Sequence, residues 1–252
     1  MPPPRVSIAI PAYNEAPRLP PFLRQLEASL EDCVGSVELL VVDDGSRPEE
    51  RDAHRSATEA LADAWKRGPH SAVFVEAPRN QGKAAAIRLG WSRARADSSW
   101  LGFLDADGAV PAHEVARLVD LLADADFDAL ASSRIRMAGH TIVRSEFRHW
   151  QGRVFATLTE LALHLGLYDP QCGYKLFRAE LLRPVLGRLK EKTWLLDVEV
   201  LALIARAGGR IREEPIDWAD TGVSKVRFGV DAVRMARDLA ALRLRLDREA
   251  GS

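Results

Sequence analysis

Two aspartates separated by one residue follow an apolar run in the stretch WLGFLDADGAVP, residues 100–111. Asp105 and Asp107 carry like charges, and these repel each other unless a cation lies between them or both face water. Two interpretations are open from these residues alone. The pair belongs either to a turn ahead of a helix or to a metal or catalytic site.

Two further polar clusters follow apolar runs, PAYNE at residues 11–15 and DDGS at residues 43–46. Asp43 and Asp44 can accept hydrogen bonds from a ribose or a pyrimidine N–H, and Gly45 permits the positive φ of a tight turn near a ligand. Tyr13 can pack on a base or a sugar, and Glu15 can accept from a hydroxyl. These residue types suit a nucleotide or a sugar.

A loop that leads into a helix, RNQGKAAAIRLG at residues 79–90, contains Gly82 and Lys83. It is not a complete phosphate-binding loop, because no glycine stands five residues before Gly82 and Ala84 replaces the serine or threonine. Two roles for Lys83 are open: contact with a donor phosphate, or a solvated lysine at a helix start.

The elements that would position these residues alternate between strand and helix. Nearly continuous apolar runs, typical of strands covered on both faces, occur at residues 6–12, 37–44, 72–77, 100–105 and 127–132. Helical spacing of apolar residues occurs at 18–30, 49–67, 83–96 and 111–123. This order predicts an α/β fold with a mainly parallel, doubly wound sheet, whose ligands bind at the carboxyl ends of the strands. The three polar clusters therefore converge on one edge, which favours a site over simple turns.

The second half of the chain has a different pattern. We expect a loop at 133–145, a turn and strand at 169–178 and a strand at 208–218, with helices at 146–167, 191–207 and 229–248. Without internal repeats or a Pro/Gly-rich linker, the chain is predicted to be one domain, residues 1–252. The apolar stripe of 146–167 and the five arginines of the last helix each have two open interpretations. They are ordinary core and solvated faces, or a surface that lies on an anionic membrane.

Composition excludes several classes of protein. Of the 252 residues 47% are hydrophobic, enough for a sizeable core, and the net charge of −1 argues against nucleic-acid binding. Two cysteines and the absence of a signal peptide favour a reducing, cytoplasmic setting. No run reaches the roughly 18–20 apolar residues of a membrane span. The six histidines show no spacing such as HExxH, and we expect surface or core roles for them.

The motifs together resemble those of family 2 glycosyltransferases with the GT-A fold, and the match covers nearly the whole chain. They are IPAYNE, VVDDGS, NQGKAAAIRLG, DADGA, SSR, DPQCGYKLFR and WLLDVEV. Within that family the chain most resembles the dolichyl-phosphate glucosyltransferases and mannosyltransferases. The resemblance implies a nucleotide-sugar-binding half, residues 1–132, and an acceptor-side elaboration, residues 133–252.

Site residues follow from the resemblance by position. The implied nucleotide-sugar contacts are Pro11, Ala12, Tyr13, Asn14, Glu15, Asp43, Asp44, Gly45, Ser46, Gly82, Lys83, Asp105, Ala106 and Asp107. Asp105 and Asp107 would also hold a divalent metal, Mg²⁺ or Mn²⁺. The implied acceptor-phosphate contacts are Arg134, Arg144 and Arg148, whose guanidinium forks match phosphate oxygens.

Asp107, Asp169 and Asp197 are the predicted catalytic residues. Asp169 would orient or deprotonate the acceptor or reach the metal, and the alternative is a turn-forming aspartate before a proline. Asp197 and Glu199 lie in an apolar helix, where a charge is costly unless paired or functional. A contact with the donor sugar and a structural ion pair are both open for them.

The resulting functional hypothesis is an inverting, metal-dependent transfer of a hexose to dolichyl or polyprenyl phosphate. The donor would be of the UDP-glucose or GDP-mannose type, and the DADGA stretch favours glucose. One alternative is transfer to a soluble small molecule, which the missing membrane segment favours. Another is a nucleotide-sugar-binding protein without catalysis, which the intact aspartate pair and arginines disfavour.

Overall fold

A single large sheet forms the centre of the computed structural model, which describes residues 3–143, 146–192, 195–220 and 230–250. Its strand order is β3-β2-β1-β4-β7-β5-β8. The strands are β1 (Arg5–Ala12), β2 (Ser36–Asp43), β3 (Ser71–Glu76), β4 (Trp100–Leu104), β5 (Ala129–Ser133), β7 (Tyr174–Arg178) and β8 (Ile211–Pro215). Every residue of β4 and β5 is buried, as their unbroken apolar runs predict.

Strand direction is uniform apart from β7. The β1–β2, β2–β3, β1–β4 and β5–β8 pairs are parallel, whereas β7 runs antiparallel to both β4 and β5. The predicted α/β fold with a mainly parallel, doubly wound sheet is confirmed. The reversed strand was not predicted.

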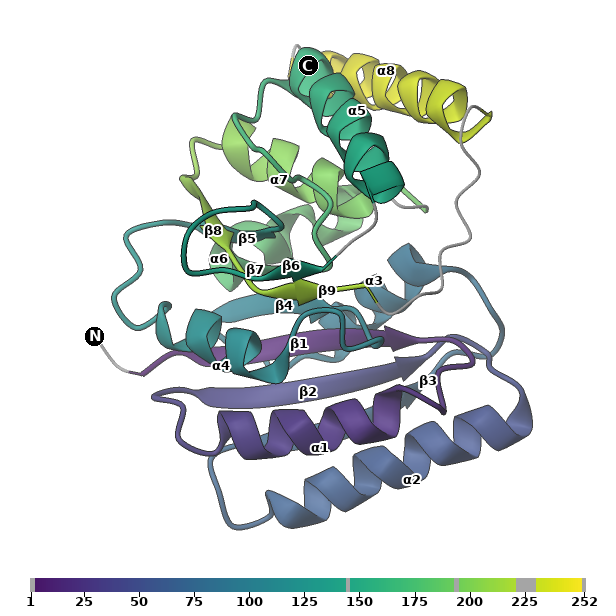
Figure 1. Cartoon of the computed structure of the whole chain (residues 1–252), viewed down its shortest axis with the longest axis vertical. Coiled ribbons are helices and arrows are strands. Elements are labelled where there is room, and N and C mark those ends of the chain that lie inside the picture. Colours follow the sequence, from purple (N-terminus) through teal and green to yellow (C-terminus); the bar gives the residue numbers. More distant parts are fainter. Residues whose placement is uncertain (1–2, 144–145, 193–194, 221–229, 251–252) are drawn as a thin grey trace.

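Helices cover both faces of the sheet (Figure 1). Apolar side chains of α1, α2 and α4 form one core layer with β1 and β2, and those of α3, α5, α7 and α8 form the other with Leu101, Phe103 and Phe177. The helices are α1 (Leu19–Leu30), α2 (Pro48–Ala64), α3 (Lys83–Arg93), α4 (Ala112–Asp120), α5 (Glu146–Leu163), α6 (Ala179–Leu182), α7 (Leu196–Arg206) and α8 (Val230–Ala250). A 3-10 helix at Arg183–Arg188 follows α6, and neither of these two was predicted.

The second half differs from the predicted boundaries in three places. The predicted strand 208–218 is divided into β8 and a short β9 (Trp218–Ala219). β9 pairs in parallel with β6 (Ile142–Val143), which lies inside the predicted loop 133–145. The predicted helix 191–207 begins at Leu196 within the described chain.

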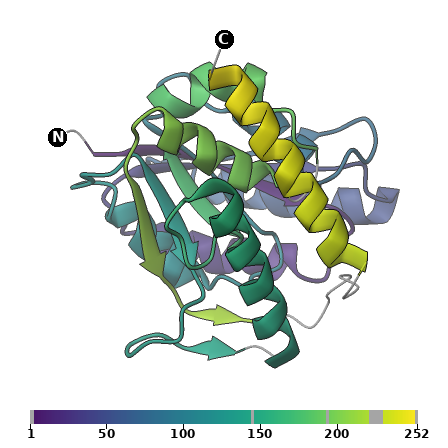
Figure 2. The ribbon, with the colours of Figure 1, turned by 90° about the horizontal axis from the view of Figure 1, so that it is seen from above.

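The predicted helix 146–167 is the third difference, since α5 ends at Leu163. His164 adopts a left-handed φ of 51° and Gly166 one of 67°, and such residues stop a helix. The helices α5 and α8 lie side by side (Figures 1 and 2). In the last turn of α5, the carbonyl of Ala162 accepts a hydrogen bond from Arg243 of α8 at 2.7 Å. In the described ranges, no helix combines the length and apolar character needed to cross a bilayer.

Candidate active site

The turn after β4 is fitted against the start of the reversed strand. The amide of Asp105 donates to the carbonyl of Gly173 at 2.9 Å. A Cβ at Gly173 would lie 2.3 Å from Oδ2 of Asp105, so only glycine leaves room for this carboxylate. Gly108 has a φ of 71°, and Asp107 accepts from the amide of Ala109 at 3.0 Å. The tight turn thus holds both carboxylates at the carboxyl edge of the sheet.

A lysine ammonium lies directly on this turn. Gly82, with a φ of 89°, caps the start of α3, and Lys83 is the first residue of that helix. The Nζ of Lys83 lies 2.5 Å from Oδ1 of Asp105. Burial lowers the pKa of Lys83, but Asp105, Asp197 and Asp107 outweigh it and raise the pKa above its ordinary value. Lys83 therefore stays a cation beside the carboxylates; its side chain is 46% exposed but forms an ion pair, and its contact with a donor phosphate stays a prediction.

A second, fully buried ammonium links the segment before β7 to α7. Lys175 donates to the carbonyl of Cys172 at 2.6 Å and to Oδ2 of Asp197 at 2.9 Å. The ring of Phe103 lies 5.6 Å from this ammonium and 5.3 Å from that of Lys83. Asp197 thus forms an ion pair and also belongs to the electrostatic surroundings of Lys83.

Arg134 and Asp169 form a bidentate ion pair where β5 ends. Nε and Nη2 of Arg134 donate to the two carboxylate oxygens of Asp169 at 2.6 and 2.8 Å. Burial raises the pKa of Asp169, yet the Arg134 guanidinium and its hydrogen bonds lower it to about 2. Glu213 fixes the backbone, accepting from the amides of Tyr168 and Asp169 at 2.8 and 2.7 Å. A carboxylate with so low a pKa is a poor base and a good anchor for an arginine.

The turn after β2 uses its first aspartate internally. Oδ1 of Asp43 accepts from the amide of Ser46 at 2.9 Å, and Oδ2 lies 2.8 Å from Nδ1 of the buried His54. Nε2 of His54 accepts from the amide of Glu15 at 3.1 Å, so Nδ1 carries the proton that Asp43 accepts. Burial raises the pKa of Asp43, but the hydrogen bonds from His54 and Ser46 outweigh it and lower the pKa. Asp43 thereby ties α2 to the PAYNE loop.

The second aspartate of this turn holds the loop that carries Lys83. Asp44 accepts from the amides of Gln81 and Gly82 at 2.8 and 2.7 Å. Gly45 has a φ of 70°, and a Cβ there would lie 2.4 Å from the amide nitrogen of Asn80. The DDGS turn therefore acts as a scaffold beneath the 79–83 loop.

The PAYNE loop is joined to the same scaffold. Asn14, at a φ of 54°, donates its amide to Oγ of Ser46 at 3.0 Å and accepts from the amide of Arg47 at 3.1 Å. Glu15 pairs with Arg18 at 2.5 Å. Tyr13 is 44% exposed and is the loop side chain most open to a ligand. Pro11 is partly buried, and Ala12 and Ala106 are buried in the core.

The structure brings most of the predicted site residues to one edge, although they differ in accessibility. Lys83, Asp105 and Asp197 are linked through the contacts given above, and the Arg134–Asp169 pair interacts electrostatically with Asp105 and Lys175. Arg144 lies outside the described residues, as does the side chain of Arg148, so their roles stay predictions. Sequence reasoning missed three residues, Lys175, Gly173 and His54. A lysine inside the apolar run YKLF was the one available signal, since a buried ammonium requires a partner.

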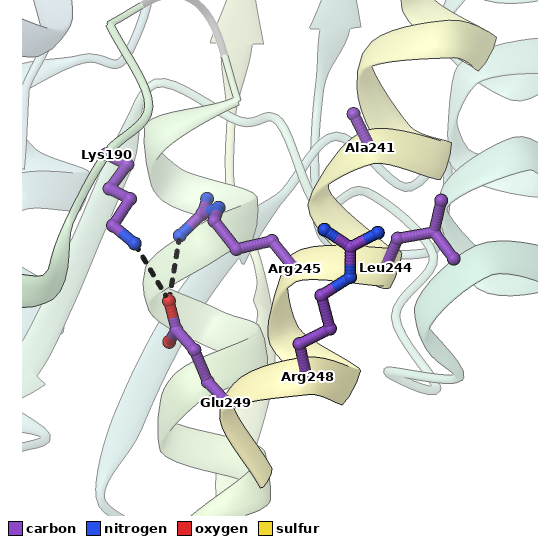
Figure 3. A pocket seen from close by; sticks show the side chains of 6 residues that line it. All are labelled: Lys190, Ala241, Leu244, Arg245, Arg248 and Glu249. Carbon is purple, nitrogen blue, oxygen red and sulfur yellow. Dashed lines mark hydrogen bonds and ion pairs between the residues drawn. The ribbon is translucent and has the colours of Figure 1, made fainter. Parts of the chain in front are cut away.

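Glu199 has a structural role at a distance from the Asp105 turn. Its buried carboxylate accepts from the amides of Lys190 and Glu191, both at 3.0 Å, and pairs with Arg245 of α8 at 2.7 Å. Figure 3 shows the neighbouring pocket along α8, where Lys190 and Arg245 point toward Glu249. No predicted site residue lines this pocket, which is lined by Lys190, Ala241, Leu244, Arg245, Arg248 and Glu249.

The donor set at the Asp105 turn fits a hard divalent cation. Asp105 and Asp107 offer carboxylate oxygens, and Mg²⁺ and Mn²⁺ prefer such ligands, completed by substrate phosphate and water. The ammonium of Lys83 on Asp105 shows that this carboxylate already attracts positive charge. These two residues are therefore suited to hold a metal.

Comparison with known proteins gives consistent matches. The glycosyl transferase family 2 model matches residues 7–186. The dolichyl-phosphate beta-glucosyltransferase of Saccharomyces cerevisiae is 29% identical over an alignment that covers 95% of this chain and 74% of the yeast protein. Its Drosophila melanogaster counterpart is 32% identical over 93% of this chain and 73% of the fly protein.

Among solved structures, glucosyl-3-phosphoglycerate synthase from Mycobacterium tuberculosis, in complex with Mn²⁺, UDP and glucosyl-3-phosphoglycerate, has a similar fold. The TM-score is 0.66 at 18% identity, over 96% of this chain and 79% of that one. Mannosyl-3-phosphoglycerate synthase from Rubrobacter xylanophilus also has a TM-score of 0.66, at 14% identity, over 98% of this chain and 75% of that one.

Proposed function

Because this chain belongs to glycosyltransferase family 2, we propose that it transfers a hexose from a nucleotide diphosphate sugar to a polyprenyl phosphate, with inversion at the anomeric carbon. Glucose is the favoured sugar, since the curated relatives named above are dolichyl-phosphate beta-glucosyltransferases. The observation that carries the proposal is the single edge at which Asp105 with Lys83 and Arg134 with Asp169 form two adjacent charged centres.

The first charged centre suits the donor diphosphate. Asp105 and Asp107 would hold Mg²⁺ or Mn²⁺, which neutralises charge on the leaving nucleoside diphosphate. Lys83 is positioned by Asp44 through the 81–82 amides and lies beside the same turn, where its ammonium can bind a phosphate oxygen. Tyr13 would pack on the base or the ribose, since its side chain is exposed next to Asn14, which is bonded to Ser46 of the DDGS turn.

The second charged centre suits the acceptor phosphate. Arg134 presents a guanidinium that Asp169 holds in one orientation, and a phosphate oxygen can approach its remaining N–H groups. A phosphate monoester is already an anion near neutral pH, so its attack on the anomeric carbon requires little help from a base. The low pKa of Asp169 agrees with this, because catalysis then depends on positioning. Arg144 and Arg148 would complete the acceptor site.

A surface on α5 and α8 would bring the enzyme to its lipid substrate. Trp150, Val154 and Leu161 on α5 and Leu244 on α8 are exposed, and Trp150 and Leu161 retain 65% and 69% of their accessible surface. Two of the predicted cationic residues are engaged within the protein, Arg245 with Glu199 and Arg243 with Asp247. We therefore expect a peripheral, reversible interaction in which these apolar side chains contribute more than the arginines.

The test is a transfer assay with purified protein, Mn²⁺ or Mg²⁺, and a panel of donors that includes UDP-glucose and GDP-mannose. Each donor is incubated with a polyprenyl phosphate in detergent, with the dephosphorylated polyprenol and with phosphoglycerate. Formation of polyprenyl phosphate hexose from one donor alone is the expected result. Transfer to phosphoglycerate but not to the lipid would replace the acceptor assignment, and no transfer with any donor and metal would contradict the proposal.

A further inference from the structure

Two histidines and two carboxylates gather at the amino end of α4, the helix that follows the Asp105 turn. Nε2 of His113 lies 3.3 Å from Oδ2 of Asp217, and one ligand atom each from His113, Glu114 and Asp217 lie within 4.8 Å of one another. Nδ1 of His140 lies 3.5 Å from Oε1 of Glu114 and 3.6 Å from Oδ1 of Asp217. Three segments contribute to this cluster: α4, the 134–141 loop and the β8–β9 connection.

Three members of the cluster, His113, Glu114 and Asp217, are close enough together to hold one ion. Zn²⁺ bonds of about 2.0–2.2 Å in a tetrahedral site place neighbouring ligand atoms about 3.3–3.6 Å apart. The His113–Asp217 separation lies in this range, and His140 lies 3.5 Å from Glu114 and 3.6 Å from the other oxygen of Asp217. Two imidazole nitrogens and two carboxylate oxygens also form a donor set that Zn²⁺ accepts.

His140 supplies an independent observation. Its Nδ1 is buried yet has no hydrogen-bond partner, although two carboxylates lie within 3.6 Å. A buried ring nitrogen without a partner is costly, and coordination of a cation would satisfy it. Glu114 accepts a hydrogen bond from the amide of Asp217 at 2.9 Å, and Asp217 accepts one from the amide of Thr141 at 2.7 Å. Each accepting oxygen has a second lone pair, so both carboxylates remain available to an ion.

We propose that His113, Glu114 and Asp217 bind a structural Zn²⁺ ion and that the ring of His140, beside Glu114 and Asp217, turns to complete the coordination, separate from the donor metal at Asp105 and Asp107. Local charge favours a cation, since Glu114, Glu214 and Asp217 outnumber the guanidinium groups of Arg117 and Arg212. The site is reached from solvent along His113, whose side chain is 64% exposed. The bound ion would fasten the 134–141 loop and β9 to α4, and Arg134 lies 5.4 Å from the ring of Trp218 in β9.

The test is a titration of metal-free protein with ZnCl2 by calorimetry, and with CoCl2 by visible absorption. Asp105→Asn/Asp107→Asn protein is titrated in parallel, so that the donor site does not contribute. One equivalent of zinc should bind in both proteins, with the intense absorption of tetrahedral Co²⁺. His113→Ala and His140→Ala should each weaken binding at least ~tenfold, because even outer-shell partners of metal ligands have effects of that size.

His164→Asn is the matched control, because it removes an exposed histidine outside the cluster and asparagine tolerates the positive φ found there. It should leave zinc affinity unchanged. Zinc should also raise the melting temperature of the wild type and not that of His113→Ala. Absence of binding, binding unchanged in both histidine variants, or a site lost in Asp105→Asn/Asp107→Asn would each overturn the proposal. These readouts do not involve sugar transfer, so they can fail independently of the proposed function.

Discussion

Two aspartate pairs, each at the end of a parallel strand, have different surroundings. Asp43 and Asp44 after β2 are buried, and their oxygens accept from the side chain of His54 and from three backbone amides. Asp105 after β4 is partly exposed and faces the ammonium of Lys83. The comparison shows that the tertiary partners differ: the first pair fixes loops, and the second leaves charged groups open at the sheet edge, where we propose that the donor binds.

The largest effect should come from the pair after β4. Asp107→Asn removes an anion where charge develops on the leaving diphosphate, so kcat should fall by ~100-fold or more. The melting temperature should change little, because the residue lies on a turn at the sheet edge. Steady-state kinetics at saturating Mg²⁺ and Mn²⁺ measure the effect. Near-normal turnover would remove the distinction between the two pairs.

Arg134 tests whether the second charged centre serves the acceptor. Arg134→Ala should lower kcat/KM for the lipid ~10- to 100-fold, the loss expected for a charge-assisted phosphate contact, while nucleotide affinity by calorimetry stays unchanged. Arg134→Lys keeps a positive charge beside Asp169 but loses the two-pronged guanidinium. Its kcat/KM for the lipid should lie between those of the wild type and Arg134→Ala. Arg210→Ala, which alters an exposed arginine paired with Asp126, is the control. A collapse of donor affinity instead would assign Arg134 to the diphosphate.

Asp44 sharpens the comparison from the scaffold side. Asp44→Asn turns one acceptor of the Gln81 and Gly82 amides into a donor, so the free energy of unfolding should fall by about 1–3 kcal/mol. Donor KM should rise because the Lys83 loop loses its support, whereas kcat should change less than in Asp107→Asn. Urea denaturation and kinetics on one preparation measure both. A large loss of kcat with unchanged stability would mean that Asp44 touches substrate.

The Arg134–Asp169 pair should also show in acid. The pKa of Asp169 is lowered from 3.8 to about 2, so the stability it contributes is present above pH 3.8 and is lost as the pH falls toward 2. The difference in unfolding free energy between wild type and Asp169→Asn should therefore shrink between pH 5 and about pH 2.5. Asp126→Asn, at an exposed position, should show no such trend. A constant difference across this range would contradict the lowered pKa.

The smallest effect is expected at the α5–α8 surface. Leu161→Ser with Leu244→Ser removes two exposed apolar side chains, and partitioning onto anionic vesicles should fall about two- to tenfold, less than full burial of two leucines would give. Co-sedimentation at low and high salt measures this, with Val34→Ser, an exposed apolar residue far along the chain, as the control. Loss of binding with salt alone would assign the surface to its arginines.

The sheet could be predicted because each strand is recognisable from its own short run of residues. Runs such as VSIAIPA and WLGFL are too apolar for any place but a strand covered on both faces, and the turns that follow them mark the carboxyl edge. The direction of β7 could not be predicted, because an apolar run of five residues fits either direction in a buried sheet. Only the pairing with β4 and β5 decides it.

The candidate site was predicted as a set of residues but not as a set of roles. Asp43 and Asp105 are the same residue type after similar strands, and what separates them is His54 and Lys83, which are 11 and 22 positions away. Arg134 and Asp169 were predicted separately, and no pattern in the sequence indicates that a residue 35 positions away neutralises each of them. Roles of this kind depend on contacts that the folded chain alone creates.

The reversed strand β7 sets the distance between the two charged centres. Because β7 lies between β4 and β5, the ends of those two strands are about 9.5 Å apart, twice the spacing of neighbouring strands. The reversal also presents the amino end of β7 at this edge, so that the Asp105 carboxylate packs against Gly173, where any other residue would place a side chain. In the function we propose, the width of one strand would thus set the distance between the donor and acceptor phosphates.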